Sequence, residues 1–423
     1  MTSISSSRPA INRALFVTPW LPTETDWTAT AGIARRQRLL VDALKQCASS
    51  IDVLVYVSQK RFDGSEAMCA RIERELNAFW EGDFNVSVCR WQEAPPRPGL
   101  WAHYGAPVLD FTRHAHFGKC AGPAQVAALR QALSRGPDLV VAHRLQCAVP
   151  LLLAGAALPP FLLDLDDVEH VAFARGIRQP PMWVGKYLEY LQIPALMAGE
   201  RRAIAASRKT LVCSEVDRRR LERLFRVDNV EAIPNAVASR AATAPSGSPT
   251  LLLLGHYSFT PNRLGAEYFL NSVWPLVRQA LPGARVVIAG AGPQAIRHAL
   301  DGDHGVSFPG YVDDLDLLYA GCCAVICPIL SGGGTRLKVM EAASYARAVV
   351  STTVGAEGID LRDGDEIFLA DDAAAFADRC VALLTDAALA RDVGARARDA
   401  IERLYGRDRV VQRLASLFAG RAT

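Results

Sequence analysis

The chain has 423 residues, of which 50% are hydrophobic and 22% are charged. This length exceeds that of one ordinary domain and predicts two, and the composition is typical of a folded globular protein. The formal net charge of +3, without dense runs of Lys and Arg interleaved with aromatic residues, argues against nucleic-acid binding.

The cysteines and the apolar runs provide evidence on the cellular location of the protein. The ten cysteines form no C-x-x-C pairs, and Cys322-Cys323 lie inside an apolar run, which favours buried, reduced thiols and a cytoplasmic location. Residues 1–10 lack an apolar signal-peptide core. The longest apolar run, residues 149–163, contains Pro159-Pro160 and is too short for a bilayer, so we expect no membrane span.

Short apolar runs alternate with helical patterns along the chain. Residues 14–18, 51–57, 139–142 and 161–164 predict buried strands in the first half. A stretch rich in proline and small residues at 241–249 predicts a linker. The second series of expected strands is 250–254, 285–289, 306–308, 324–327, 348–351 and 366–369.

This order predicts an α/β protein with two Rossmann-like, doubly wound parallel-sheet domains. We place the first domain at residues 1–240 and the second at 241–405, followed by a helical segment at 406–423. Arg218-Arg219-Arg220, Arg223 and Arg226 share a helical pattern with Leu221, Leu224 and Phe225. This pattern fits either a solvated helix face or attachment to a membrane surface.

The sequence Gly332-Gly333-Gly334-Thr335-Arg336-Leu337-Lys338 is typical of an anion-binding site. Glycines let backbone N–H groups approach a ligand, a helix expected to start near Thr335 points its positive end at them, and Arg336 and Lys338 add full charges. This combination suits a diphosphate. Glu341, further along the helix, could accept hydrogen bonds from sugar hydroxyls. The alternative is a glycine-rich turn before a surface helix.

Ligands of parallel sheets bind at the carboxyl ends of the strands. In the first half these positions hold Thr18 to Pro22, followed by Gly32 and its neighbouring arginines, then His143-Arg144, and then Asp164 to His170. The first resembles an anion site, and the other two could supply catalytic or acceptor-binding groups, with Asp166 or Asp167 as a general base. The alternatives are a strand-end histidine satisfied by backbone and aspartates that cap a helix.

In the second half, Gly255 and His256 follow residues 250–254, with Asn262 and Arg263 close behind. The sequence Gly290-Ala291-Gly292-Pro293 matches a dinucleotide fingerprint only in part, and Pro293 favours a simple tight turn. The loop of residues 91–119, with His103, His114 and His116, shows no pattern that predicts a role.

Several motifs together resemble the retaining, nucleotide-sugar-dependent glycosyltransferases of the GT-B fold, similar to family 4 and to its bacterial cell-surface polysaccharide branch with a GGGTR loop. The resemblance covers the whole chain. In the second half it rests on Gly255 with Pro261-Asn262 and on residues 288–293, 308–312, 332–341 and 348–352. In the first half it is looser and rests on residues 163–169, 200–201, 212–215 and 233–237.

The resemblance implies that the second domain holds the sugar donor, that the first holds the acceptor, and that residues 406–423 cross back to the first domain. It assigns Gly333, Gly334, Thr335, Arg336 and Lys338 to the diphosphate, Glu341 to the ribose, Tyr311 and Val312 to the base, and His143 to the transferred sugar. Gly32, Gly255 and Arg263 join the expected donor contacts, and Arg336, Lys338, His143 and Asp166 form the expected catalytic set.

The implied partners are a nucleotide sugar and a glycan or lipid-linked acceptor, with no metal or cofactor and no nucleic acid. The implied location is cytoplasmic, with a peripheral position at the inner face of the membrane as a further option. Two residues depart from the family pattern: Gly333 stands where an acid is usual, and His256 where an arginine is usual. A non-catalytic partner subunit, a nucleotide-sugar epimerase and, least of all, a nicotinamide enzyme are the alternatives.

Overall fold

The computed structural model describes residues 10–19, 32–58, 62–92, 99–155, 158–240, 246–298 and 304–420. The chain forms two compact units. The first contains Ala31–Pro234 and Asp408–Thr423 together with the N-terminal strand, and the second contains Asn235–Arg407. The change from the first unit to the second therefore lies before the linker expected at 241–249.

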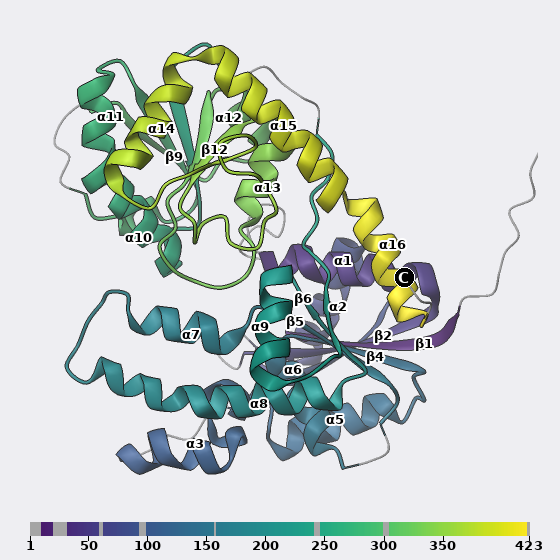
Figure 1. Ribbon diagram of the computed structural model, residues 1–423. Helices are drawn as coiled ribbons and strands as arrows, with labels where there is room; N and C mark the ends of the chain where they lie inside the picture. Colours follow the sequence, from purple (N-terminus) through teal and green to yellow (C-terminus); the bar gives the residue numbers. More distant parts are fainter. Residues whose placement is uncertain are drawn as a thin grey trace, which may run out of the picture. The chain divides into compact units, whose positions relative to one another are not determined.

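In the first unit, the described residues form a seven-stranded parallel sheet of order β3-β2-β1-β4-β5-β6-β7 (Figure 1). Its strands are β1 (Ile11–Pro19), β2 (Ala48–Val57), β3 (Asn85–Arg90), β4 (Leu139–His143), β5 (Phe161–Asp166), β6 (Lys209–Val212) and β7 (Val230–Ala232). Its longer helices are α1 (Gly32–Cys47), α2 (Glu66–Trp80), α5 (Pro123–Leu133), α6 (Leu145–Leu153), α7 (Glu169–Ile177), α8 (Ile193–Ala206), α9 (Glu215–Phe225) and α16 (Arg407–Phe418).

The four strands expected in this half are confirmed, but the sequence analysis missed β3, β6 and β7. Residues of β3 are exposed or half-buried, so this edge strand lacks a continuous apolar run. The other two have only 4 and 3 residues, which is too short for a periodic signal.

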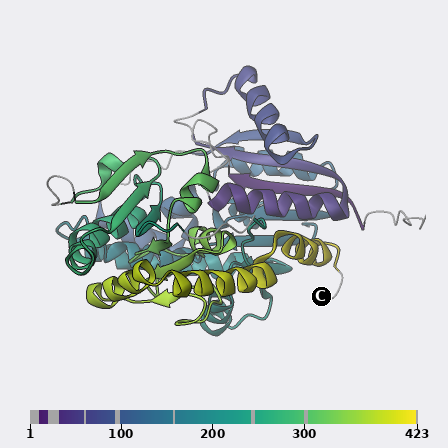
Figure 2. The same cartoon turned by 90° about the horizontal axis from the view of Figure 1, so that it is seen from above.

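Helices cover both faces of this sheet. On one face Trp80 of α2 packs edge-on against Phe16 of β1, with ring centroids 5.9 Å apart. Figure 2 shows α1 in purple lying along β1 on this face. On the other face, Leu129 of α5, Val149 of α6 and Ile204 of α8 join one buried core with the sheet. Residues 14–19 of β1 are all buried, because successive side chains of the strand point to opposite faces and both faces are covered by helices.

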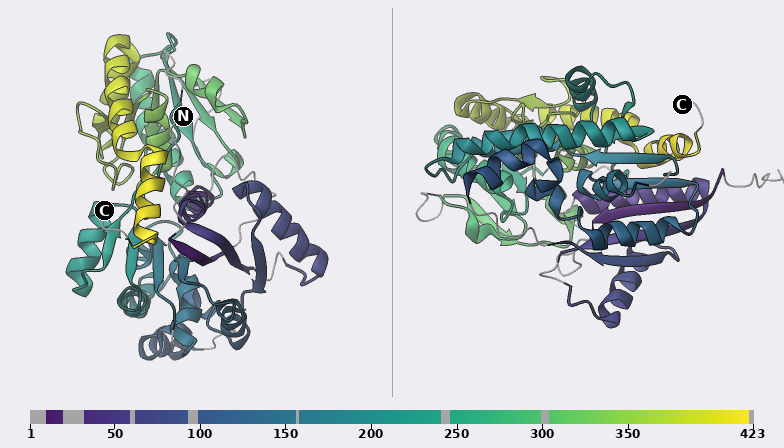
Figure 3. Two further views of the ribbon diagram at one scale, coloured as in Figure 1. Left: turned by 90° about the vertical axis from the view of Figure 1, so that its right-hand side faces the viewer. Right: turned by 90° about the horizontal axis from the view of Figure 1, so that it is seen from below.

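The last helix, α16, belongs to the first unit. Arg413 pairs with Glu231 of β7 at 2.8 Å, and Arg208 donates a hydrogen bond to the Leu417 carbonyl at 3.2 Å. Figure 3 shows this helix in yellow next to teal elements of the first unit.

In the second unit, the described residues form a six-stranded parallel sheet of order β10-β9-β8-β11-β12-β13. The strands are β8 (Thr250–Leu254), β9 (Arg285–Ala289), β10 (Val306–Gly310), β11 (Ala324–Cys327), β12 (Ala348–Ser351) and β13 (Phe368–Leu369). Four of them have the expected bounds. The last is shorter than expected because Glu366 instead accepts hydrogen bonds from the backbone N–H and the guanidinium of Arg362, both at 2.8 Å.

Two buried cores flank this second sheet. Phe269, Trp274 and Phe376 form one with α10 (Thr260–Tyr268), α11 (Trp274–Ala280) and α14 (Ala373–Thr385). The other lies beneath α13 (Leu337–Ser344) and α15 (Ala387–Tyr405), with α12 (Leu315–Ala320) beside them. The expected fold class, two parallel-sheet α/β domains, is confirmed.

No helix within the described ranges combines the length and the apolar character needed to cross a membrane.

A glycine in α15 sets how closely this helix approaches the sheet. A Cβ at Gly394 would lie 2.1 Å from the Ala346 carbonyl oxygen, whereas a Cβ at Gly176 in α7 would meet nothing within 4 Å. We expect Gly394→Ala to lower the free energy of unfolding by about 1–3 kcal/mol through overpacking. Gly176→Ala should be neutral or slightly stabilising. Urea unfolding followed by circular dichroism measures both, and equal stability of the two variants would contradict this packing.

Candidate functional site

The carboxyl edge of the second sheet is built from closely packed backbone. Gly255, Gly290 and Gly310 stand at the ends of the neighbouring strands β8, β9 and β10. Gly290 has a φ of 130°, and a Cβ there would lie 1.8 Å from the Gly255 carbonyl oxygen. Its N–H donates to the Gly310 carbonyl at 2.7 Å. Only glycine fits such an approach, so this edge presents main chain rather than side chains.

The loop of residues 331–336 continues this edge after β11. Gly332 and Gly334 have φ values of 112° and 67°, which favour glycine. The Arg336 guanidinium donates to the carbonyls of Gly333, of Gly334 at 2.9 Å and of Ser331 at 3.3 Å. The arginine therefore fixes the turn and keeps its positive charge beside the loop.

Helix α13 begins at Leu337, two residues after Thr335, near which its start was expected. Arg336 is its N-cap, with φ −86° and ψ 93°, because its side chain reaches back to the loop carbonyls. Thr335 is held separately, since its hydroxyl accepts a hydrogen bond from the Asn235 side chain at 2.9 Å. Glu341 is half-buried and lies about one turn into the helix.

Lys338 ties the loop to the end of β8. Its Nζ donates to the Leu254 carbonyl at 2.7 Å and to Asn262 Oδ1 at 2.9 Å. Burial lowers the pKa of Lys338, and the nearby charge of Arg336 adds to this. Asn262 in turn donates to the His256 carbonyl at 3.1 Å.

Of the two side chains that follow Gly255, the one that meets the loop is Asn262. Arg263 instead pairs with Glu267 one turn along α10, at 3.1 Å. The sequence analysis selected Arg263 by its charge, and no signal in the sequence showed that Asn262 is the partner of Lys338. Tyr311, which is 38% exposed, and the half-buried Val312 follow the end of β10.

In the first unit, Asp164 is the centre of a fully buried cluster. Arg36, His143 and Asp164 all have side chains with 0% exposure. The Arg36 Nη2 lies 2.6 Å from Asp164 Oδ1, and the His143 Nδ1 lies 2.9 Å from Asp164 Oδ2. Burial alone would raise the pKa of Asp164, but Arg36 and His143 outweigh it and lower the pKa to about 2.

The partner of His143 is thus a carboxylate rather than neighbouring backbone, which differs from the alternative considered for a strand-end histidine. An ionised Asp164 accepts the Nδ1 proton, which leaves Nε2 as the ring nitrogen not engaged by Asp164. Within the described part of the chain, this buried Nε2 has no hydrogen-bond partner. It is therefore the ring atom that can receive a ligand hydroxyl.

Next to this cluster lie two non-glycine residues with left-handed backbone. Arg144 has a φ of 70° and Asp166 a φ of 61°. Such conformations cost of order 1–3 kcal/mol and cluster at functional sites. The Arg144 guanidinium lies 3.5 Å from both Asp167 and Glu169, and Asp166 accepts a hydrogen bond from the Cys213 thiol at 3.5 Å. The aspartates expected in this loop thus surround one arginine.

His116 is a member of this group that the sequence analysis did not find. Its Nε2 lies 3.5 Å from Glu169 Oε1. Burial, with smaller contributions from Arg144 and Lys119, lowers the pKa of His116 to about 3, so the ring is neutral. Burial also raises the pKa of Glu169, although Arg144 opposes this.

Several buried polar atoms around Arg144 have no hydrogen-bond partner among the described residues: Arg144 Nε, Gln146 Oε1, His116 Nε2 and His143 Nε2. Buried polar groups are normally paired, so a cluster of unpaired ones indicates a place for a ligand or water. The group lies at the carboxyl ends of β4 and β5, where parallel sheets bind their ligands.

Gly32 is the first described residue of α1 and is half-buried. The anion site suggested for Thr18 to Pro22 and Gly32 lies mostly outside the described residues, since 20–31 are not among them.

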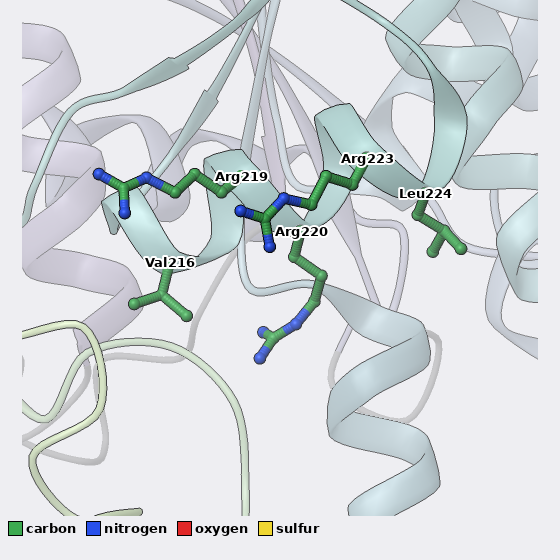
Figure 4. Close-up of a pocket in the computed structure, with 5 residues that line it drawn as sticks. All are labelled: Val216, Arg219, Arg220, Arg223 and Leu224. Carbon is green, nitrogen blue, oxygen red and sulfur yellow. The ribbon is translucent and has the colours of Figure 1, made fainter.

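The basic face of α9 borders a hollow of about 660 Å³ lined by Val216, Arg219, Arg220, Arg223 and Leu224 (Figure 4). Arg219 pairs with Glu215 at 3.2 Å and Arg220 with Asp217 at 2.7 Å, each within the helix. Such i,i+3 and i,i+4 pairs are typical of a solvated helix face, the first of the two interpretations of this segment.

Residues 248–386 match the model of the protein family described as glycosyl transferases group 1. The match lies within the second unit. A curated relative, an uncharacterized 44.6 kDa protein in the cps region of Klebsiella pneumoniae, is 32% identical over 133 residues. That match covers 29% of this chain and 34% of the relative, so it spans about a third of the relative's length.

Solved structures show that the fold extends over nearly the whole chain. Sucrose-phosphate synthase from Thermosynechococcus elongatus superposes with a TM-score of 0.65 at 16% identity, covering 97% of this chain and 98% of that one. Anabaena Alr3699/HepE in complex with UDP-glucose gives a TM-score of 0.63 at 16% identity, covering 96% and 99%. The fold is thus that of the GT-B glycosyltransferases.

Within the segment that matches the family model, Arg336 and Lys338 bring two cationic side chains to the glycine loop. His256 supplies only its backbone carbonyl, which accepts from Asn262.

The Asp164 cluster gives a prediction for stability. Asp164→Asn leaves Arg36 buried without its counter-charge and should lower the free energy of unfolding by about 3–5 kcal/mol at pH 7. The pKa of Asp164 is lowered to about 2 in the folded protein. Its stabilisation is therefore complete above the unfolded pKa near 4 and is lost as the pH falls toward 2.

The difference between wild type and Asp164→Asn should consequently shrink between pH 4 and pH 2 in urea unfolding. Asp228→Asn, at an exposed position of the same unit, serves as control and should stay within about 0.5 kcal/mol of wild type. A constant difference across this pH range would contradict an ionised Asp164.

Proposed function

We propose that this protein is a retaining glycosyltransferase of the family 4 type that moves a sugar from a nucleoside-diphosphate donor to a glycan or lipid-linked acceptor. We place it in the cytoplasm, in the synthesis of cell-surface polysaccharide. The observation that carries the proposal is the glycine loop with Arg336 and Lys338 at the start of α13, inside the matched domain. The cps-region relative and the UDP-glucose complex of HepE support the pathway and the donor class.

The donor diphosphate would lie on the loop of residues 331–336. The N–H groups of Gly333, Gly334 and Thr335 and the positive end of the α13 dipole would attract the negative charge of the diphosphate. Negative charge grows on the diphosphate as its bond to the sugar breaks, so Arg336 and Lys338 stabilise the transition state more than the ground state. The glycine backbone at 332–334 lets the phosphate oxygens come close.

The remaining donor contacts follow from positions around the same edge. Glu341 on α13 binds the ribose hydroxyls, and Tyr311 and Val312 contact the base. Gly255 keeps the end of β8 free of side chains. Arg263 contributes from its ion pair with Glu267.

The acceptor would occupy the polar group at the ends of β4 and β5. His143 Nε2 accepts a hydrogen bond from a hydroxyl of the transferred sugar, and Asp166 serves as a base for the acceptor hydroxyl. Asp166, Asp167 and Glu169 outnumber Arg144, since His116 is neutral. This balance favours an acceptor that presents uncharged hydroxyls over one that presents a phosphate or carboxylate at this point.

The donor site is tested by nucleotide binding. In thermal unfolding with UDP, GDP, TDP, CMP or NAD, we expect one nucleoside diphosphate to raise the Tm, because a ligand at a hundred times its Kd adds about 2.7 kcal/mol. Arg336→Ala should lose most of this shift and lower the transfer rate about 10²- to 10³-fold, the usual loss for one transition-state donor. Arg391→Ala, at an exposed position of α15, is the matched control.

Near-normal turnover of Arg336→Ala would end the diphosphate assignment. A wild-type protein that gains no stability from any of these nucleotides would favour the non-catalytic partner subunit, in which the departures at Gly333 and His256 reflect lost activity. Release of an altered sugar without acceptor would favour the epimerase.

The acceptor group is tested by Glu169→Gln, which removes a charge while keeping the shape of the side chain. We expect an unchanged nucleotide shift and a drop of about 10- to 100-fold in kcat/KM for the acceptor, the value of one charged hydrogen bond. Glu66→Gln, at an exposed position of α2, is the control. Transfer of radiolabelled sugar into acceptors from a membrane extract measures both, and equal rates would remove Glu169 from the site.

A further inference from the structure

The first unit carries a cluster of exposed apolar side chains on two neighbouring segments, 100–109 and 182–191, which we call the apolar ridge. Trp101 is 69% exposed, Leu109 is 80%, Trp183 is 54% and Val184 is 103%. The first segment contains a short π-helix, Trp101–Gly105, and α3 (Ala106–Leu109). The second follows α7 and ends in a 3-10 helix, Lys186–Gln192. Large apolar side chains this exposed mark an interaction surface when they are contiguous.

Hydrogen bonds hold the two segments together and make the ridge one surface. The Tyr104 hydroxyl donates to Glu189 Oε1 at 3.1 Å. Gln192 Nε2 lies 3.1 Å from His103 Nε2, and the same histidine nitrogen lies 3.5 Å from Glu189. Figure 1 shows α3 next to the chain that leads from α7 to α8. These polar contacts link the two segments, whereas the apolar side chains of the ridge are exposed.

Cations accompany the second segment. Lys186 lies 4.8 Å above the Trp183 ring and donates to the Pro181 carbonyl at 3.0 Å. The Arg178 guanidinium donates to the Tyr190 hydroxyl at 2.9 Å. Residues 175–192 contain three cations, Arg175, Arg178 and Lys186, and one acid, Glu189, so the net charge of this segment is +2. Lys186 is buried, so the exposed Arg178 and the half-buried Arg175 supply the positive charge at the edge of the ridge.

We propose that the apolar ridge docks the protein on an anionic lipid surface. This inference rests on the proposed function, because it gives the place at which a lipid-linked acceptor is reached. Trp and Tyr are the residues that prefer the boundary between lipid and water. Apolar contact combined with attraction between cations and anionic lipids is the pairing that holds a peripheral protein at a membrane.

The positive charge of the second segment favours an anionic lipid surface over a second copy of the chain as the binding partner. A two-fold dimer through the ridge would bring the same patch against itself, so the positive segments would face each other. An anionic surface meets the same charges with attraction. The fully exposed Val184 and its neighbour Trp183 would insert among lipid headgroups without a matching pocket.

The test is co-sedimentation of the full-length protein with vesicles. We expect binding to vesicles of phosphatidylglycerol and phosphatidylethanolamine, weak binding to pure phosphatidylcholine, and release at high salt, because exposed charges are then screened. The variant with Trp183→Ser and Leu109→Ser should reduce the vesicle partition coefficient at least about tenfold, through lost apolar burial. The control variant carries Leu224→Ser and Leu317→Ser, at exposed positions on α9 and α12.

Lack of binding by the wild type, or equal binding by the ridge variant, would overturn the proposal. A loss of vesicle binding confined to the control variant would also overturn the proposal, because the membrane contact would then lie at Leu224 or Leu317 instead of at the ridge. A wild-type dimer that the ridge variant converts to a monomer would show a second copy as the occupant. The Tm shift with nucleoside diphosphate is measured on the same samples: its absence in the wild type would refute the donor site alone, whereas the vesicle result stands independently.

Discussion

The first unit depends on one buried carboxylate. Asp164 accepts hydrogen bonds from Arg36 and His143, and Arg36 also donates to the carbonyls of Ile233 at 2.9 Å and Pro234 at 3.1 Å. One charge pair therefore joins α1, β4 and β5 to the segment at which the chain leaves this unit. Because removing one partner of a buried pair leaves an uncompensated charge, these elements cannot shift independently at little cost. The orientation of His143 and the backbone of Arg144, whose N–H donates to the Asp164 carbonyl at 2.7 Å, follow from that constraint.

In the second unit, hydrogen bonds likewise fix the cationic side chains near the glycine loop. Arg336 and Lys338 direct their hydrogen bonds mainly to main-chain carbonyls and to an amide, which are neutral acceptors. Neutral acceptors such as these fix the position of a cation without adding a negative charge beside it. A site that is ordered before its ligand arrives needs little rearrangement in the transition state, and this is the main source of electrostatic catalysis. The glycines at 332 and 334 let the loop follow a path that other residues adopt only with strain.

The sequence predicted what depends on local pattern and missed what depends on distant contacts. Strands 250–254, 285–289, 324–327 and 348–351 were found because each is a short, mainly apolar run. Strand β3, at the sheet edge, was missed because it is half-buried. Arg36 and Asp164 are 128 residues apart, and no spacing rule connects them. His116 lies in a loop without a pattern, and only the fold brings it to Glu169. The sequence likewise did not show that Asn262 rather than Arg263 bonds Lys338, because only the fold gives the direction of a side chain.

The two departures from the family pattern can be understood from the geometry of the loop. The Arg336 guanidinium binds the carbonyl of Gly333, so a carboxylate at position 333 would stand next to that guanidinium and compete with a diphosphate for it. Glycine at this position avoids that competition. An arginine at position 256 would likewise add a third cation close to Lys338, whose pKa burial and Arg336 already lower. Taken together, the two changes keep the number of charges small and place the cations on α13 and its N-cap, where the helix dipole acts in the same direction.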